Sequence, residues 1–189
     1  MRWGLVVAVL GVGCHRRVEP VAVVEPGLVP RAREPITIDG AWREPAWNVQ
    51  ALTGDLLGDD HAVARPVSQL RLLADDRRLL VGLYAADEDI RTTDHFDLTI
   101  GAVTLRYDPL GHVTPAIEGA HATVDTDGTL DHPEDYDEEW VIEADVPLAR
   151  VGLTPGGAPV AVTARRCDVT KDGVQRCGTW TGAVHLGAP

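Results

Sequence analysis

The stretch that decides the fold reads Ile36-Thr37-Ile38-Asp39-Gly40-Ala41-Trp42-Arg43-Glu44-Pro45-Ala46-Trp47. Its two isoleucines alternate with a polar residue, which predicts a short strand, and Asp39-Gly40 predicts a turn. Two tryptophans follow within the same stretch. The residues before it have the character of an export signal and a tether, and those after it the character of a β domain. We therefore expect the folded domain to span residues 36–189.

The composition bounds the class of protein. At 189 residues the chain has room for one domain with extensions, and a domain of roughly 150 residues buries a substantial core. Lys and Arg number 17 against 29 Asp and Glu, which gives a formal net charge of -12 at pH 7. Such a surface repels the phosphates of nucleic acids. We exclude a nucleic-acid partner and expect cations or neutral ligands.

Residues 1–13 have the features of a signal peptide. Arg2 supplies a positive charge, an apolar run follows it, and small residues precede Cys14. The segment resembles a bacterial lipoprotein signal, which implies that Cys14 becomes the lipidated N-terminus and anchors the chain to a membrane. An ordinary cleaved signal, in which Cys14 has no role, is the alternative. Because both signals imply export, we expect an outer-membrane lipoprotein or a periplasmic protein of the cell envelope.

Residues 14–35 form a proline-rich tether in this interpretation. Pro20, Pro26, Pro30 and Pro35 interrupt valines and charged residues, and no strand or helix period is sustained. Prolines hold such a segment extended at about 3 Å per residue, so it is suited to act as a semi-rigid spacer. A ragged N-terminus without a spacing role is the alternative.

The rest of the chain contains about ten short segments with strand character, separated by turn residues. No stretch supports a long amphipathic helix. Many short strands at this spacing predict an all-β fold, an antiparallel β-sandwich or jelly roll. The expected strands cover residues 47–52, 67–74, 79–86, 96–100, 103–107, 113–117, 121–124, 140–146, 160–167 and 174–180.

Cys167 and Cys177 flank a predicted hairpin turn. With Lys171-Asp172-Gly173 as the loop and Gly173 in the left-handed conformation, the two cysteines face each other on adjacent strands. Cysteines that face each other in this way can form a disulfide, and an exported protein meets the oxidising compartment that favours it. We predict a Cys167–Cys177 disulfide that stabilises the fold by about 2–3 kcal/mol.

A set of short motifs, in this order across residues 36–187, resembles the family 9 carbohydrate-binding modules and their bacterial relatives. The resemblance implies a β-sandwich jelly roll, sugar binding without catalysis and bound calcium. It also places Trp42, Trp47 and Trp140 in structural motifs, where we expect core positions. The motifs are Ile38-Asp39-Gly40 with Trp42 and Trp47, Asp76 with Leu79-Leu80-Val81-Gly82-Leu83-Tyr84 and Asp87, Gly128-Thr129, Trp140-Val141-Ile142-Glu143-Ala144-Asp145-Val146-Pro147-Leu148, and Arg165 with Gly178-Thr179-Trp180.

Sugar binding of this kind needs exposed aromatic rings, because pyranose rings stack their C–H faces on them. The resemblance makes Trp180 the first candidate, since a late tryptophan often contributes to the sugar platform in the family. Packing of Trp180 in the core or across the hairpin is the alternative. Aromatic residues make up only 5% of the chain, so a second ring comes from few positions, and we take Phe96 and Tyr136 as candidates.

An acidic loop suggests a site for Ca²⁺. Residues 123–134 match the spacing of a twelve-residue calcium loop, with Gly128 at its sixth position and Thr123 at its first. The flanks predict strand and proline instead of helices, so we expect an oxygen-lined loop site and not an EF-hand; a solvated acidic loop is the alternative. A second acidic group follows the strand at 79–86. The predicted ligands are Asp125, Asp127, Asp131, Glu134 and Asp87.

These observations predict a protein that binds poly- or oligosaccharide without catalysis, at the cell surface or in the periplasm, in support of carbohydrate catabolism. No nucleophile motif such as Gly-x-Ser-x-Gly is present, so we expect no enzyme. The alternative is an envelope lipoprotein that uses the same fold as a structural or protein-interaction module. A haem-binding sandwich requires paired histidines, because the only methionine is Met1.

Overall fold

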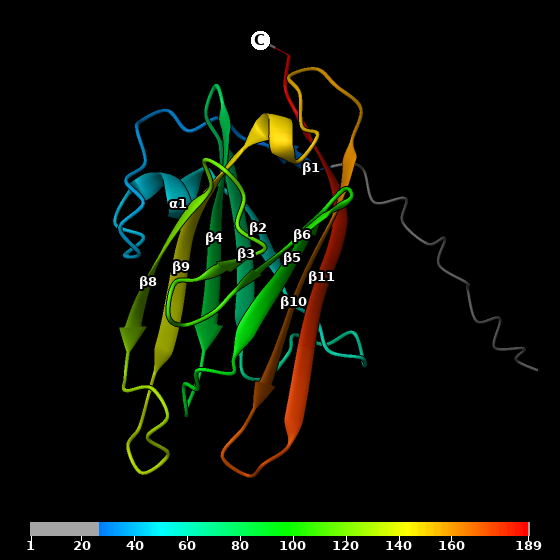
Figure 1. Ribbon diagram of the computed structural model, residues 1–189. Helices are drawn as coiled ribbons and strands as arrows, with labels where there is room; N and C mark the ends of the chain where they lie inside the picture. The colour runs from blue at the N-terminus through cyan, green and yellow to red at the C-terminus, as the bar shows by residue number, and fades with distance from the viewer. Residues whose placement is uncertain (1–26, 189) are drawn as a thin grey trace, which may run out of the picture.

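The computed structural model describes residues 27–188, which form a sandwich of two β-sheets (Figure 1). Neighbouring strands are antiparallel, except that β1 runs parallel to β11. This confirms the predicted β-sandwich. The first sheet has the order β1 (Gly27–Val29), β11 (Gln175–Leu186), β10 (Val160–Val169), β5 (His95–Ile100), β6 (Val103–Tyr107) and β7 (Val113–Thr114). The second has the order β2 (Leu52–Asp55), β3 (Ser68–Ala74), β4 (Arg78–Ala86), β9 (Glu139–Pro147) and β8 (His121–Asp127).

The core lies between the sheets and follows from the alternation of the central strands. In β5 every second residue is apolar and buried, as strand geometry requires when one face is covered. In β10 the same alternation buries Val162 and Ala164 and then the charged Arg166 and Asp168. β4 and β9 are buried for most of their length, because the outer face of their sheet is covered as well. Trp140 and Phe96, with ring centroids 5.3 Å apart, join the two sheets within this core.

Residues 36–47 and the short helix that they lead into cover the outer face of the second sheet, and two predictions for this region are wrong. Residues 36–38 are not in a strand, and residues 47–52 are not one either, because the short helix α1 (Pro45–Val49) occupies part of them. Pro45 suits the first helical position, where its missing N–H costs nothing. Trp47 is fully buried in a second apolar cluster, in which Trp42 and Leu80 also pack.

A buried carboxylate fixes this covering segment to the sheet. Glu143 on β9 accepts hydrogen bonds from the backbone N–H groups of Asp39 (2.9 Å), Gly40 (2.8 Å) and Trp42 (3.2 Å). Gly40 has φ of 89°, and a Cβ there would come within 3.0 Å of the backbone of β8, so only glycine fits. The Asp-Gly turn predicted from sequence is therefore present as a docking point on the outer face.

The N-terminal boundary also differs from the prediction. Strand β1 lies inside the predicted tether of residues 14–35, yet it pairs with β11 and buries Val29 in the core. The sandwich therefore includes residues from at least Gly27 onward. The predicted signal peptide and the lipidation site Cys14 lie outside the described residues. Within residues 27–188, no helix is long and apolar enough to cross a membrane.

The last hairpin forms as predicted. Cys167 on β10 faces Cys177 on β11, and the two are joined in a disulfide. Gly173 has φ of 77° in the turn, and its N–H donates to the Thr170 carbonyl at 2.7 Å. A further short 3₁₀ helix, Leu148–Arg150, follows β9 where proline was expected to end the strand.

Candidate functional site

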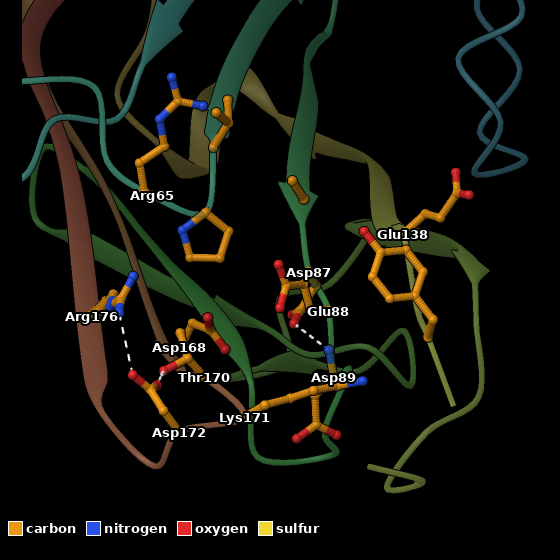
Figure 2. Close-up of a pocket in the computed structure, with 14 residues that line it drawn as sticks. Arg65, Asp87, Glu88, Asp89, Glu138, Asp168, Thr170, Lys171, Asp172 and Arg176 are labelled. Atoms are coloured by element: carbon orange, nitrogen blue, oxygen red, sulfur yellow. Dashed lines mark hydrogen bonds and ion pairs between the residues drawn. The ribbon is translucent and has the colours of Figure 1, made fainter. Parts of the chain in front are cut away.

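A pocket of about 510 Å³ opens at one end of the sandwich. Four connections meet there: the loop before β3, the loop after β4, the loop between β8 and β9, and the β10–β11 hairpin (Figures 1 and 2). Figure 2 shows Arg65 and Arg176 on one side, Glu138 on the other, and Asp87 and Asp168 between them. The ends of both sheets therefore contribute to one concave, mostly charged surface.

Three buried carboxylates converge at this pocket. Asp87 directly follows β4, Asp94 directly precedes β5, and Asp168 lies near the end of β10. Each offers an oxygen atom, and these atoms lie within 4.8 Å of one another. We call these residues the aspartate triad. Strands from both sheets bring them together, so the triad lies across the end of the sandwich.

The charge of this region is only partly compensated. Arg166 is buried, and its guanidinium donates to Asp87 at 2.5 Å and lies 3.7 Å from Asp168. Arg91 pairs with Asp89, a fourth buried carboxylate beside the triad. Four buried carboxylates against two guanidinium groups leave two negative charges without a partner. A buried charge that lacks a partner is costly, so the site favours either protonation or a bound cation.

The protonation behaviour reflects this excess of charge. The pKa of Asp94 is raised to about 7, chiefly by burial and in addition by the Asp87 and Asp168 carboxylates, against a backbone hydrogen bond from Arg91 that lowers it. Burial likewise raises the pKa of Asp168 to about 6, although Arg166 acts in the opposite direction. The folded protein without a cation therefore holds protons here that the unfolded chain would release at the same pH.

Several buried carboxylate oxygens of this site have no hydrogen-bond partner. Asp168 is 3% exposed, and neither of its carboxylate oxygens has a hydrogen-bond partner. Asp89 Oδ1 is buried and unpartnered as well. Such orphaned acceptors are rare in folded proteins and call for an explanation. Carboxylate oxygens are the ligands of hard cations, so these residues fit Ca²⁺ in ligand type and in charge.

The predicted calcium loop is not the place where ligands converge. Asp125 and Asp127 are exposed on β8, which stays extended to residue 127, and Glu134 is exposed in the following loop. Asp131 accepts hydrogen bonds from the Thr92 N–H (3.1 Å) and hydroxyl (2.9 Å), so it joins two loops. Among residues 27–188, only the aspartate triad forms a metal-type cluster. Of the five predicted ligands, the cluster contains Asp87 alone.

The aromatic candidates have three different environments. Phe96 is fully buried in the core, so its faces are closed to a sugar and that prediction is wrong. Trp180 on β11 is partly buried against the core, and its indole covers Gly54 and Gly182. Trp180 therefore packs against the core and across the strands, as the alternative interpretation of this residue expects. Tyr136 is 70% exposed in the pocket lining, with the Lys171 ammonium 5.7 Å from its ring centroid.

Sequence reasoning missed Asp168 and did not select Asp94 as a ligand. Asp94 belongs to the acidic group that follows the core strand, together with Asp87, Asp89 and Asp97, and the sequence singles out only Asp87 of that group as a ligand. Asp168 directly follows Cys167, and the predicted disulfide already fixed its place near the end of a strand. The signal for both was that acidic residues stood at the ends of predicted strands. Using that signal required knowing which strand ends share one end of the sandwich.

Comparison with known structures agrees with the geometry of the fold. A family 9 carbohydrate-binding module from Caldicellulosiruptor kristjanssonii, in complex with cellotriose, superposes with a TM-score of 0.63 at 13% identity. The match covers 87% of this chain and 95% of that one. The chain has the fold of a family 9 carbohydrate-binding module.

Two further structures support the assignment of the fold. The Caldicellulosiruptor module in complex with glucose matches with the same TM-score and identity and is covered to 97%. A candidate carbohydrate-binding protein from Bacteroides uniformis ATCC 8492 matches with a TM-score of 0.54 at 11% identity, over 84% of this chain and 90% of its own. No protein-family model and no curated protein matches the chain.

Proposed function

We propose that this protein binds carbohydrate without catalysis, in the pocket at the end of the sandwich. The observation that carries the proposal is an exposed aromatic ring, Tyr136, in an open pocket lined mainly by charged residues, on the fold of a carbohydrate-binding module. A volume of about 510 Å³ is within the range of small-ligand sites. The solved modules with this fold are in complex with cellotriose and glucose, which makes β-linked glucose the first ligand to test.

The pocket contains the groups that such binding needs. Tyr136 offers a ring face for stacking, and Lys171 above it donates to the Asp135 carbonyl, which holds the ammonium near the ring. Glu88 and Glu138 line the pocket and are exposed, so their carboxylates are available to sugar hydroxyls. Charged groups of both signs suit a ligand that has many hydroxyls and little net charge.

Calcium is the second part of the proposal. Asp87, Asp94 and Asp168 would hold the ion, and Asp89 beside them adds negative charge. The ion would supply the two positive charges that the buried carboxylates lack. Because the triad joins the ends of β4, β5 and β10, cation binding is expected to stiffen the pocket and stabilise the fold.

We further propose that the protein acts in the cell envelope, on the sequence of residues 1–14 alone. Lipidation at Cys14 would place the pocket at a membrane surface, where it would support capture of sugar for catabolism. The test is metabolic labelling with a radioactive fatty acid. Label is expected in the wild-type chain and absent in Cys14→Ser; label in both variants would exclude this anchor.

The test of the binding itself is a glycan array probed with the full chain, once with CaCl₂ and once with EDTA. We expect binding to β-glucan oligosaccharides in calcium and weaker binding in EDTA. Absence of binding to every glycan in calcium would reject the proposal. It would favour the rival interpretation, an envelope protein that uses this fold for protein interaction.

A further inference from the structure

The aspartate triad does not lie beneath the ligand pocket as a separate feature, because it forms part of the pocket wall. Asp87 and Asp168 both line the pocket, as does their neighbour Asp89. Asp94 alone of the triad is absent from the lining. A cation held by all three therefore has protein oxygens on one side and the open pocket on another.

The protein provides too few oxygens to complete the coordination of such a cation. Both oxygens of Asp87 already accept hydrogen bonds, from the Asp89 N–H, from the Trp140 indole and from Arg166. One oxygen of Asp94 accepts from the Arg91 N–H at 2.8 Å. Within the triad, only Asp168 has both oxygens free. If Asp87 and Asp94 each give one oxygen and Asp168 gives both, the triad supplies about four oxygens. Ca²⁺ takes about six to eight, which leaves at least about two positions.

We propose that a cation bound at the aspartate triad contacts the carbohydrate directly, through two neighbouring hydroxyl groups of one sugar ring. Vicinal hydroxyl oxygens are neutral, hard ligands like the water molecules they would replace. Tyr136, in the same pocket, then packs against a ring whose orientation the cation sets. This inference rests on the proposed carbohydrate binding and names how the ligand is recognised: a sugar with a free vicinal diol.

The alternative is a cation that only holds the three strand ends together, with water in its remaining positions. Loss of sugar binding in EDTA does not separate these two roles, because a loosened pocket would also bind poorly. A measurement of the water molecules on the cation does separate them. Tb³⁺ suits this purpose, since it is a hard cation that replaces Ca²⁺ on oxygen ligands. Trp140, whose Nε1 lies 3.2 Å from Asp87 Oδ2, stands close enough to excite it.

The experiment measures the luminescence lifetime of Tb³⁺ on the full chain in H₂O and in D₂O, with and without saturating cellotriose. The difference between the two lifetimes counts the water molecules on the ion. We expect Trp-sensitised emission that Asp168→Asn abolishes and that Asp127→Asn, an exposed carboxylate on β8, leaves unchanged. We expect cellotriose to remove about two water molecules, one for each hydroxyl.

Each outcome decides one claim. Cellotriose that binds in a parallel titration and leaves the hydration of Tb³⁺ unchanged overturns direct coordination and leaves the proposed carbohydrate binding in place. Absence of sensitised emission in the wild type overturns the cation site. No binding of cellotriose or of any array glycan rejects the proposed function, and with it the inference.

Discussion

Replacing Asp168 by asparagine is predicted to have effects of opposite sign with and without calcium. Asp168 is buried, its oxygens are unpartnered, and its pKa is raised from 3.8 to about 6. A shift of about two units means that an ionised Asp168 costs the folded state on the order of 3 kcal/mol at pH 8 without a cation. The asparagine side chain has no charge, and its amide can donate to the neighbouring carboxylates. In EDTA at pH 8 the variant should therefore be more stable by about 1–3 kcal/mol.

With calcium the order should change. A cation at about a thousand times its dissociation constant stabilises the protein that binds it by about 4.1 kcal/mol. The wild type should gain that amount, whereas Asp168→Asn has lost the ligand with two free oxygens and should gain less than about 0.5 kcal/mol. The assay is urea unfolding followed by tryptophan fluorescence at pH 8, with the disulfide intact, in EDTA and in CaCl₂.

The control for this experiment is Asp127→Asn. Asp127 is exposed on β8 and was a ligand in the sequence-based prediction, yet it lies outside the triad. Its substitution should leave both the EDTA stability and the gain in calcium within about 0.5 kcal/mol of the wild type. An Asp168→Asn variant that is less stable than the wild type in EDTA, or that keeps the full gain in calcium, would refute the reasoning.

Two further predictions concern the triad and the outer face. In EDTA the free energy of unfolding should fall as pH rises from about 5 to 8. Over this range Asp94 (pKa about 7) and Asp168 (pKa about 6) hold protons in the folded protein that the same carboxyl groups have already lost in the unfolded chain. The slope reaches about 1.4 kcal/mol per pH unit for each such proton, and CaCl₂ should flatten it. A stability that rises over this interval in EDTA would contradict the burial argument. Glu143→Gln places amide hydrogens against the N–H groups of residues 39–42, so it should lower the free energy of unfolding by about 2–3 kcal/mol. Hydrogen exchange at the Gly40 and Trp42 amides should become faster. Unchanged exchange at these two amides would show that Glu143 does not hold this segment.

The central strands were predictable because burial imposes a period that the sequence displays. Residues 79–86 and 140–146 form β4 and β9 within a residue or two of the expected bounds. The register of the last hairpin followed from one glycine, because Gly173 fixes the turn and the turn fixes which cysteines face each other. In these places local chemistry determines structure without reference to the rest of the chain.

Other features depend on contacts between distant residues, and the sequence did not show them. Residues 36–38 resemble a strand, but their backbone has no strand partner, because Glu143 instead binds the turn that follows. Strand β1 looked like a tether because its partner β11 is at the other end of the chain. The calcium loop fitted by spacing alone, since spacing does not reveal that β8 remains extended through Asp125 and Asp127. Asp87, Asp94 and Asp168 become neighbours only through the topology of two sheets.

The central claim is that the pocket binds carbohydrate and that Tyr136 provides its stacking surface. It is tested most directly by calorimetric titration of the full chain with cellotriose in CaCl₂, for the wild type, Tyr136→Ala and Tyr136→Phe. Tyr136 is 70% exposed, so neither substitution should alter folding. We predict measurable binding by the wild type, a loss of roughly 10- to 100-fold in Tyr136→Ala, and near wild-type affinity in Tyr136→Phe, which keeps the ring. Equal affinity in all three proteins would contradict the placement of the sugar in this pocket.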